Sequence, residues 1–311
     1  MNTNLTVGGH DPRWIEARLR MEEAFPHGCG SRFRFRYLGF GERVLRHGLK
    51  ACGLYEKGMR NALDIGLSQI DLAFDDLPPA FDGYRILQVS DIHFGALRGL
   101  DEAMLELVAA TEADLAVLTG DYVGRRNGPL DTFSQGMARV TEALQAPDGV
   151  YAILGNHDSV RMAEPFHRLG VHLLGNRSVI LKRDSDAVTL TGIDDVYLFH
   201  TPLADAALAD APPGFKILLA HSPHMARQAA RAGYRIYLTG HTHAGQVCLP
   251  GGRPLVSMAG RGGRKLNAGL WRVGEMTGYT NSGSGVSEIP VRFNTRGEVA
   301  LITLRRARNS A

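Results

Sequence analysis

The chain has 311 residues, of which 44% are hydrophobic and 22% are charged, and its formal net charge is +3. This composition supplies ample apolar surface for a core and is typical of a globular protein with one large or two small domains. So modest a positive charge argues against a dedicated nucleic-acid-binding protein, and we expect no nucleic-acid partner.

Cysteine usage and the absence of a long apolar run indicate the compartment. Cys29, Cys52 and Cys248 are far apart and form no CxxC pair, which favours a reducing environment. No stretch approaches the roughly eighteen consecutive apolar residues of a membrane-spanning helix, and the start lacks the basic-then-apolar order of a secretory signal. We therefore expect a cytoplasmic protein.

Residues 1–66 form a distinct N-terminal region. They hold eleven Arg and Lys residues against seven Asp and Glu residues and show no sustained period. We interpret this region as a basic appendage and residues 67–311 as the main domain. Residues 32–63 mix aromatic with cationic side chains, which favours reversible contact with the inner face of an anionic membrane. The alternative is that the segment packs on the main domain, because RFRFRY alternates like a half-buried strand.

From Ser68 onward, short apolar runs alternate with segments whose apolar residues recur at helical spacing. We expect strands at residues 69–74, 84–90, 113–120, 149–155, 187–193, 215–221, 235–240 and 298–304. We expect helices at residues 100–113, 135–146 and 224–233. This alternation of strand and helix predicts α/β layering.

Five of these strands run directly into side chains that can bind a metal ion. In chain order the residues are Asp91 and His93, Asp121, Asn156 to Asp158, His221, and His241 with His243. Ligands in open α/β sheets bind beyond the carboxyl ends of the strands, so these residues can meet in one crevice. Each one alone has an ordinary structural explanation, such as a turn, a helix cap or a core histidine, but the ordered set favours a functional site.

His241 and His243 are separated by one residue, directly after the strand RIYLTG. If the backbone stays extended there, residues i and i+2 project to the same side, and the two imidazoles converge on one point. Two converging imidazoles suit a transition metal.

The residue types point to two divalent ions. Carboxylate, imidazole and amide oxygen form a mixed nitrogen and oxygen ligand set, which suits manganese, iron, zinc or cobalt better than a thiolate-bound structural zinc. We favour manganese. Two ions about 3.5–4 Å apart can share a hydroxide nucleophile in phosphate-ester hydrolysis. One carboxylate must bridge them, and Asp121, in the middle of the series, is well placed to do so.

The motifs DIH, GDY, GNHD, LLAH and GHTH, in this order, resemble the five signature blocks of the calcineurin-like metallophosphoesterase superfamily. The resemblance extends over roughly residues 70–305 and identifies residues 67–311 as the metallophosphoesterase domain. It implies a four-layer α/β fold, with two packed β-sheets flanked by helices; the strand pattern alone does not separate two sheets.

The resemblance also implies a role for each motif residue. The first metal ion would be bound by Asp91, His93 and His243. The second would be bound by Asn156, His221 and His241, and Asp121 would bridge the two. His157 would be the catalytic histidine that faces the substrate, and Asp158 would orient it.

Longer blocks narrow the resemblance to a bacterial subfamily of membrane-associated phosphodiesterases and pyrophosphohydrolases, some of which cleave UDP-2,3-diacylglucosamine. These blocks include LTGIDD, GHTHAGQVCLP and SGSGVSEIPVRFNTRGEVALITL, in which we expect Gly245, Gly283 and Gly285 to serve backbone turns. Members of this subfamily often begin with a transmembrane helix, whereas this chain begins with a basic segment that does not resemble one.

We therefore expect a binuclear metal-dependent phosphoesterase that hydrolyses a phosphodiester or pyrophosphate bond by attack of a metal-bridging hydroxide. A lipid-linked substrate, with peripheral membrane contact through residues 1–66, fits the subfamily. The alternatives are a soluble nucleotide or cyclic-nucleotide phosphodiesterase and, in another class, a non-catalytic metal-binding scaffold. Arg125 and Arg126 either contact substrate phosphate or form a solvated loop pair.

Overall fold

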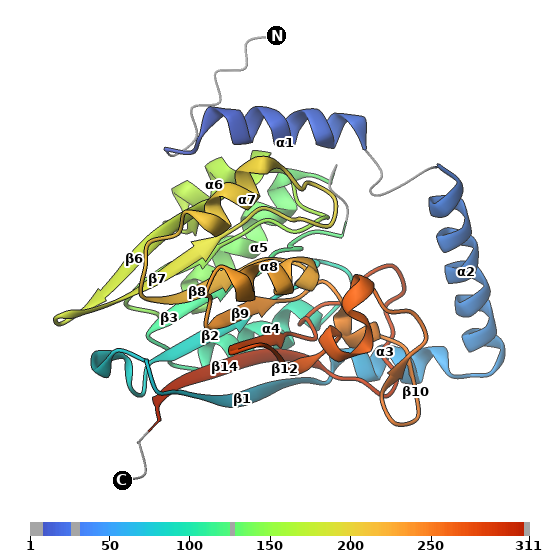
Figure 1. Ribbon diagram of the computed structural model, residues 1–311. Helices are drawn as coiled ribbons and strands as arrows, with labels where there is room; N and C mark the ends of the chain where they lie inside the picture. Colours follow the sequence, from blue (N-terminus) through green and yellow to red (C-terminus); the bar gives the residue numbers. More distant parts are fainter. Residues whose placement is uncertain (1–8, 26–31, 125–127, 308–311) are drawn as a thin grey trace.

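The computed structural model describes residues 9–25, 32–124 and 128–307. Two six-stranded sheets pack face to face, and helices cover their outer faces (Figure 1). The first sheet has the order β1 (Ile65–Phe74), β14 (Gly297–Arg306), β2 (Arg85–Val89), β3 (Leu115–Leu118), β4 (Val150–Ala152) and β5 (His172–Leu173). The second has the order β12 (Gly269–Val273), β13 (Met276–Thr280), β9 (Ile236–Thr239), β8 (Phe215–Leu219), β7 (Asp186–Gly192) and β6 (Arg177–Arg183).

Three buried apolar clusters hold these layers together. The cluster between the sheets takes side chains from both, including Ile86, Val117, Ile217, Leu238 and Ile302. Helices α4 (Leu100–Ala109), α5 (Leu130–Ala143) and α6 (Ala163–Arg168) cover the first sheet, and α7 (Pro202–Ala209) and α8 (Ala226–Arg231) cover the second. The four-layer α/β fold is therefore confirmed.

Strand direction decides where the expected ligands lie. β2, β3 and β4 run parallel in the first sheet, and β8 and β9 run parallel in the second. The carboxyl ends of parallel strands share one edge of a sheet. Three of the five metal-capable strand ends thus belong to one sheet and two to the other, instead of all lining the crevice of a single open sheet.

Each of the eight expected strands is present. The described residues form six further strands that were not expected, among them β6, β12 and β13, which complete the second sheet. β6 and β12 are edge strands with several half-buried or exposed positions, so they lack the continuous apolar run that marks a central strand. A short hairpin of β10 (Cys248–Leu249) and β11 (Arg253–Pro254) lies outside both sheets.

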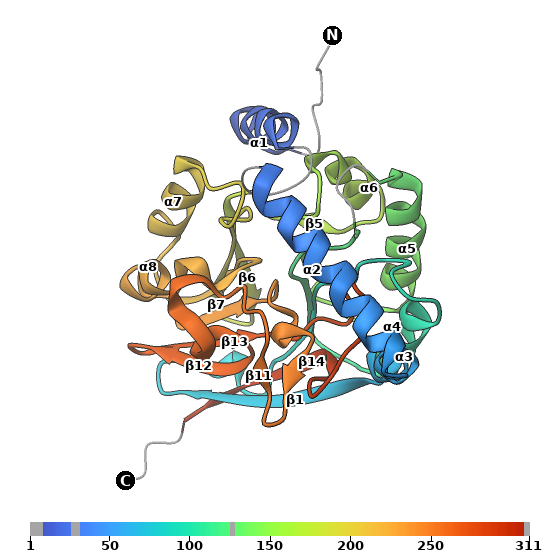
Figure 2. The same cartoon turned by 90° about the vertical axis from the view of Figure 1, so that its right-hand side faces the viewer.

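The N-terminal region forms α1 (Pro12–Ala24), α2 (Arg32–Ala51) and α3 (Tyr55–Leu63). The interpretation of RFRFRY as a half-buried strand was wrong, because these residues lie in α2. Six alternating residues were too short a pattern to outweigh the helix-compatible sequence that follows them. Figures 1 and 2 show α1 lying along the main body and α2 running along its side, set apart from the sheets. None of the helices in the described ranges is long and apolar enough to cross a bilayer.

Candidate metal centre

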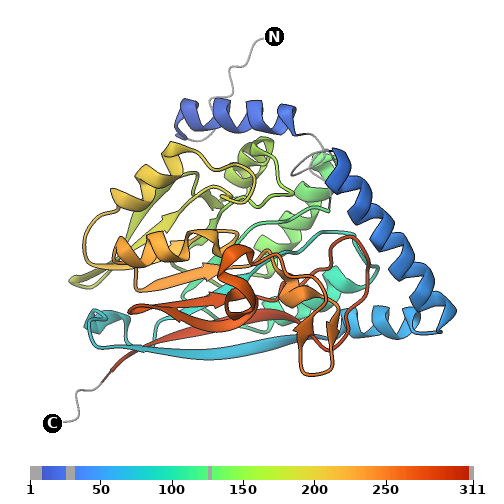
Figure 3. The same cartoon turned by 45° about the vertical axis from the view of Figure 1, so that its right-hand side comes forward.

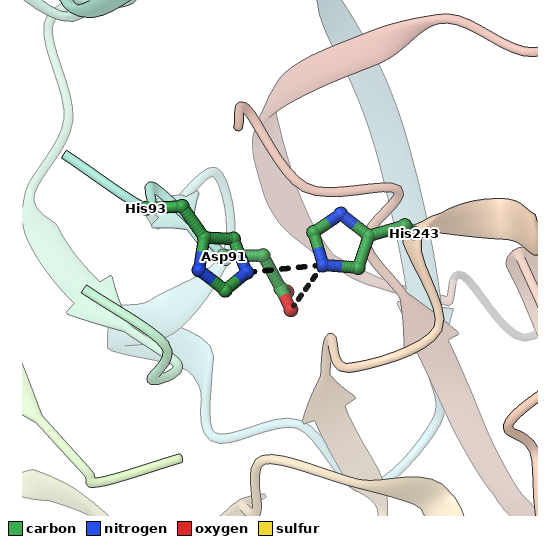
Figure 4. Close-up of side chains that lie close together, drawn as sticks. All are labelled: Asp91, His93 and His243. Carbon is green, nitrogen blue, oxygen red and sulfur yellow. Dashed lines mark hydrogen bonds and ion pairs between the residues drawn. The ribbon is translucent and has the colours of Figure 1, made fainter. Parts of the chain in front are cut away.

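Asp91, His93 and His243 form the first candidate metal group (Figure 4). Their ligating atoms lie within 4.8 Å of one another, and all three residues are buried. Nε2 of His243 lies 3.2 Å from Nε2 of His93 and 3.4 Å from Oδ1 of Asp91. Nδ1 of His93 donates to the carbonyl of Val123 at 3.0 Å, which leaves the Nε2 lone pair free to face the other two ligands.

Asp121, His221 and His241 form the second candidate group, again with ligating atoms within 4.8 Å of one another. Nδ1 of His221 donates to the carbonyl of Thr119 at 2.8 Å, so Nε2 faces the group. The Oδ1 atom of Asn156 lies 3.2 Å from this Nε2 and adds a neutral oxygen. Nε2 of His241 is buried and has no hydrogen-bond partner among the described residues, as expected of an atom that serves a metal ion.

Asp121 lies between the two groups. Its Oδ2 atom is 3.2 Å from Nε2 of His221, in the second group, and 3.9 Å from Nε2 of His93, in the first. Its other oxygen, Oδ1, accepts the backbone N–H of His157 at 2.8 Å. One carboxylate therefore reaches both groups and also holds the loop that carries His157.

The ligand-bearing turns are not extended. Asp91, His93, Asp121, His241 and His243 all have positive φ, between 48° and 72°. Non-glycine residues rarely adopt this left-handed conformation, and it clusters at functional sites. The expectation that extended geometry makes the two imidazoles of the HxH motif converge was therefore wrong: His243 joins the first group and His241 the second.

Gly285 shows why a glycine is needed beside these turns. Its N–H donates to the carbonyl of Asp91 at 2.8 Å. A Cβ atom on Gly285 would lie 2.5 Å from that same oxygen and would overlap the carbonyl oxygen of Ile92. Its role is thus close backbone approach, whereas Gly245 and Gly283 adopt φ of 81° and 76°, as expected of turn glycines.

His157 lies at the rim of the centre. Its ring is edge-on to that of His93, with centroids 5.2 Å apart, and its Nδ1 donates to the carbonyl of Gly124 at 3.0 Å. Asp158 does not contact this ring in the described structure. Its carboxylate instead accepts backbone N–H groups from Asp121, Tyr122 and Gly155 at 2.7–2.9 Å. The ring of His157 is thus oriented by the carbonyl of Gly124 and not, as expected, by Asp158.

Residues 84–245, more than half of the chain, match the family model described as calcineurin-like phosphoesterase. The chain belongs to the calcineurin-like phosphoesterase family. It is a metal-dependent phosphoric ester hydrolase, and each of its two groups of buried residues could hold a metal ion.

Three relatives of this phosphoesterase illustrate the range of the family. The metallophosphoesterase YkuE of Bacillus subtilis is 28% identical over 240 residues, which cover 74% of this chain and 82% of YkuE. A Danio rerio protein described as a transmembrane protein with metallophosphoesterase domain is 31% identical over 261 residues, 76% of this chain and 57% of that protein. Phosphodiesterase YaeI of Escherichia coli is 28% identical over 232 residues, 71% of this chain and 82% of YaeI.

Burial sets the protonation of most ligands of the phosphoesterase. It lowers the pKa of His93 to about 4 and holds those of His241 and His243 well below the usual value. Burial raises the pKa of Asp121, but His221 and His157 outweigh it and hold that pKa well below its ordinary value. Asp121 is thus ionised and these three imidazoles are neutral, whereas burial raises the pKa of Asp91 to about 6. Carboxylate and neutral imidazole are a donor set that fits divalent cations.

His221 is the exception. Burial lowers its pKa, but the charge of Asp121 outweighs burial and raises the pKa well above the usual value. A proton therefore lies between His221 and Asp121 when no cation competes for these atoms. Metal binding at the second group must displace this proton, as is common when metal ligands are protonated.

Two buried arginines near the centre were not expected from the sequence. Arg292 donates to the backbone carbonyls of His243, Ser282 and Gly285 at 2.7–3.2 Å and so holds the turns behind the first group. Arg18 of α1 reaches the loop that carries Asn156 and His157. Neither position has a local sequence signal, because a buried arginine and a surface arginine look alike in a pattern. Arg125 and Arg126 lie outside the described residues.

Proposed function

We propose that this phosphoesterase hydrolyses a phosphodiester or pyrophosphate bond at a centre of two divalent ions, with manganese as the favoured metal. Asp91, His93 and His243 would hold one ion, and Asn156, His221 and His241 the other. The observation that carries this proposal is the placement of Asp121 Oδ2 within 3.9 Å of imidazole nitrogens from both groups. When bound, the two ions supply positive charge that lowers the pKa of water towards neutrality and stabilises negative charge on the phosphate.

The chain itself supplies a candidate proton donor in His157. The ring is only partly buried and lies edge-on to a metal ligand, His93. Because Nδ1 donates its hydrogen bond to the carbonyl of Gly124, Nε2 is the nitrogen that can give a proton to the departing oxygen. Positioned acids of this kind contribute about 10²–10⁴-fold to the rate.

The test is metal analysis combined with hydrolysis of bis-p-nitrophenyl phosphate. We expect two divalent ions per active chain. Asp121→Ala should lose both ions and nearly all activity, because one carboxylate serves both groups. Asp71→Ala is the matched control, since Asp71 pairs with Arg305 on the surface and should retain both ions. Active enzyme with at most one ion per chain would contradict the proposal.

A lipid-linked substrate, reached by peripheral contact with the cytoplasmic face of a membrane, is our more specific proposal. Two surface features on the same side of the molecule support it (Figures 1 and 3). The described part of α2 exposes Val44 and Lys50, and the β10–β11 hairpin region exposes Leu249, Leu255 and Val256. Apolar side chains beside cations are the composition of reversible membrane-binding surfaces. A pyrophosphate such as that of UDP-2,3-diacylglucosamine belongs to this class, whereas a soluble nucleotide or cyclic nucleotide would need no such surface.

A further inference from the structure

Arg18 of α1 makes an unusually complete set of contacts for a residue in an N-terminal appendage. It is fully buried. Its Nη2 atom donates to the carbonyls of Gly155 and Asp158 at 2.9 Å and 2.8 Å. Its Nη1 atom pairs with Asp194, and its Nε atom donates to Glu22 at 3.0 Å. A buried guanidinium is stable only when its donors are satisfied in this way.

The two carbonyls that Arg18 binds lie on either side of Asn156 and His157 in the chain. Gly155 directly precedes Asn156, and Asp158 directly follows His157. One guanidinium group therefore fixes the backbone on both sides of a candidate metal ligand and the candidate proton donor. Asp194 and Glu22 alone would neutralise Arg18, so charge pairing does not account for the two carbonyl bonds.

Other residues of α1 extend the same contact. Glu22 accepts the hydroxyl of Ser159 at 2.6 Å and the N–H of Val160 at 2.9 Å, just beyond the residues between the two carbonyls. Trp14 donates from its indole nitrogen to Asp194 at 2.7 Å, which anchors the carboxylate that pairs with Arg18. Figures 1 and 3 show α1 lying as one straight helix along this side of the body.

We propose that α1 completes the active site and that Arg18 is a positioning residue, which acts through the backbone of the loop of residues 155–160. It holds Asn156 in reach of His221 and His157 in the orientation needed to protonate the leaving group. The proposal rests on the proposed function, because it assigns Arg18 a role in the step in which His157 gives its proton.

The first test compares leaving groups in Arg18→Met. Loss of positioning should lower kcat about 10²-fold for a diester with a poor alkoxide leaving group, but far less for one that releases p-nitrophenolate, which needs no proton. In a His157→Ala background, Arg18→Met should lower kcat little further, because each change removes the same contribution, protonation of the leaving group by His157. Arg20→Met is the matched control: Arg20 lies on the same helix, is exposed and pairs with Glu16.

The second test needs no activity. Hydrogen exchange of the backbone amides of residues 156–160 should quicken at least about tenfold in Arg18→Met, with or without added manganese, and stay unchanged in Arg20→Met. If Arg18→Met does not fold, Glu22→Gln weakens the same contact and should show both effects in smaller degree.

The outcomes separate the two proposals. Equal loss of kcat for good and poor leaving groups, or unchanged exchange in a folded Arg18 variant, would overturn the positioning role. Failure of the wild-type enzyme to hydrolyse any phosphodiester or pyrophosphate would overturn the proposed function, and the exchange measurement would still decide whether α1 fixes the loop.

Discussion

At the scale of single residues, the candidate metal centre depends on a glycine, Gly155. Gly155 ends the run that follows β4 and packs against Asp121, the carboxylate between the two ligand groups. A Cβ atom at this position would lie 2.6 Å from the backbone nitrogen of Asp121 and would overlap its Oδ1. The motif GNHD thus needs its glycine for space as much as its polar residues for chemistry.

Gly155→Ala should therefore damage both ion sites although it removes no ligand. Overpacking of a tight interior costs about 1–3 kcal/mol, and the displaced group here is Asp121. We expect urea unfolding to show a loss of stability in that range and metal analysis to show fewer than two ions. Gly48→Ala is the control, because the added Cβ would meet nothing within 4 Å among the described residues, apart from the neighbouring backbone of its own helix. Retention of two ions with full activity in Gly155→Ala would contradict this explanation.

At the scale of elements, α1 packs on the main domain, although the sequence suggested that residues 1–66 form an appendage. Asp11 caps its start by accepting the N–H of Arg13 at 2.8 Å, and Pro12 occupies its first turn. Trp14 and Ile15 are buried in the cluster that also packs the first sheet. A short helix gains most of its stability from such packing, so α1 is stable because it docks.

The docking of α1 should weaken in mild acid through His10. Its ring packs on Trp14 with centroids 5.1 Å apart, and burial, with help from Arg177 and His167, lowers the pKa of His10 from 6.5 to about 4. Between these values the unfolded chain takes up a proton that the folded chain does not. The stability from neutral His10 is present above pH 6.5 and is lost as pH falls towards 4.

The measurement is the urea midpoint at pH 7 and pH 5 for wild type and for His10→Phe, which keeps a ring but cannot titrate. We expect a smaller fall in midpoint for the variant than for wild type. An identical fall in the two proteins would show that His10 does not carry this pH dependence.

At the scale of the whole molecule, α2 stands apart from the body that the two sheets form (Figure 1). If it serves as a membrane contact, the protein should sediment with anionic vesicles at low salt and be released at high salt, which screens surface charges. Reversing two exposed cations, as in Arg43→Glu with Lys50→Glu, should weaken binding more than roughly tenfold, since each is worth about 1 kcal/mol at such a surface.

The control carries the same change of charge elsewhere, with Arg227→Glu and Arg231→Glu on the exposed side of α8. This pair should leave vesicle binding nearly intact. Removal of residues 1–66 would not test membrane contact through α2 alone, because it also removes α1 and its buried contacts. No sedimentation of the wild type at low salt would remove the support for a lipid-linked substrate.

Local pattern alone determined most of the central strands, β13 excepted, and the polar residues at their ends. Apolar runs such as LAVL and IYLT are fully buried as β3 and β9, and each is followed within three residues by a ligand candidate. This information is local, because strand propensity and the turn that follows depend on neighbouring residues. The division into two sheets came from the resemblance, since edge strands such as β6 carry too weak a pattern.

The local pattern did not determine how those residues are grouped; the resemblance implied the grouping, and the tertiary structure shows its geometry. His241 and His243 are two positions apart but belong to different candidate metal groups, and both have positive φ instead of the extended geometry that the pattern suggested. Asp158 sits beside His157 in the chain, yet its carboxylate accepts three backbone N–H groups, two from the loop after β3 and one from its own loop. Arg18 reaches Gly155 and Asp158 across 137 and 140 residues of sequence. Such contacts depend on how helices and sheets pack, and packing joins residues whose local patterns carry no information about one another.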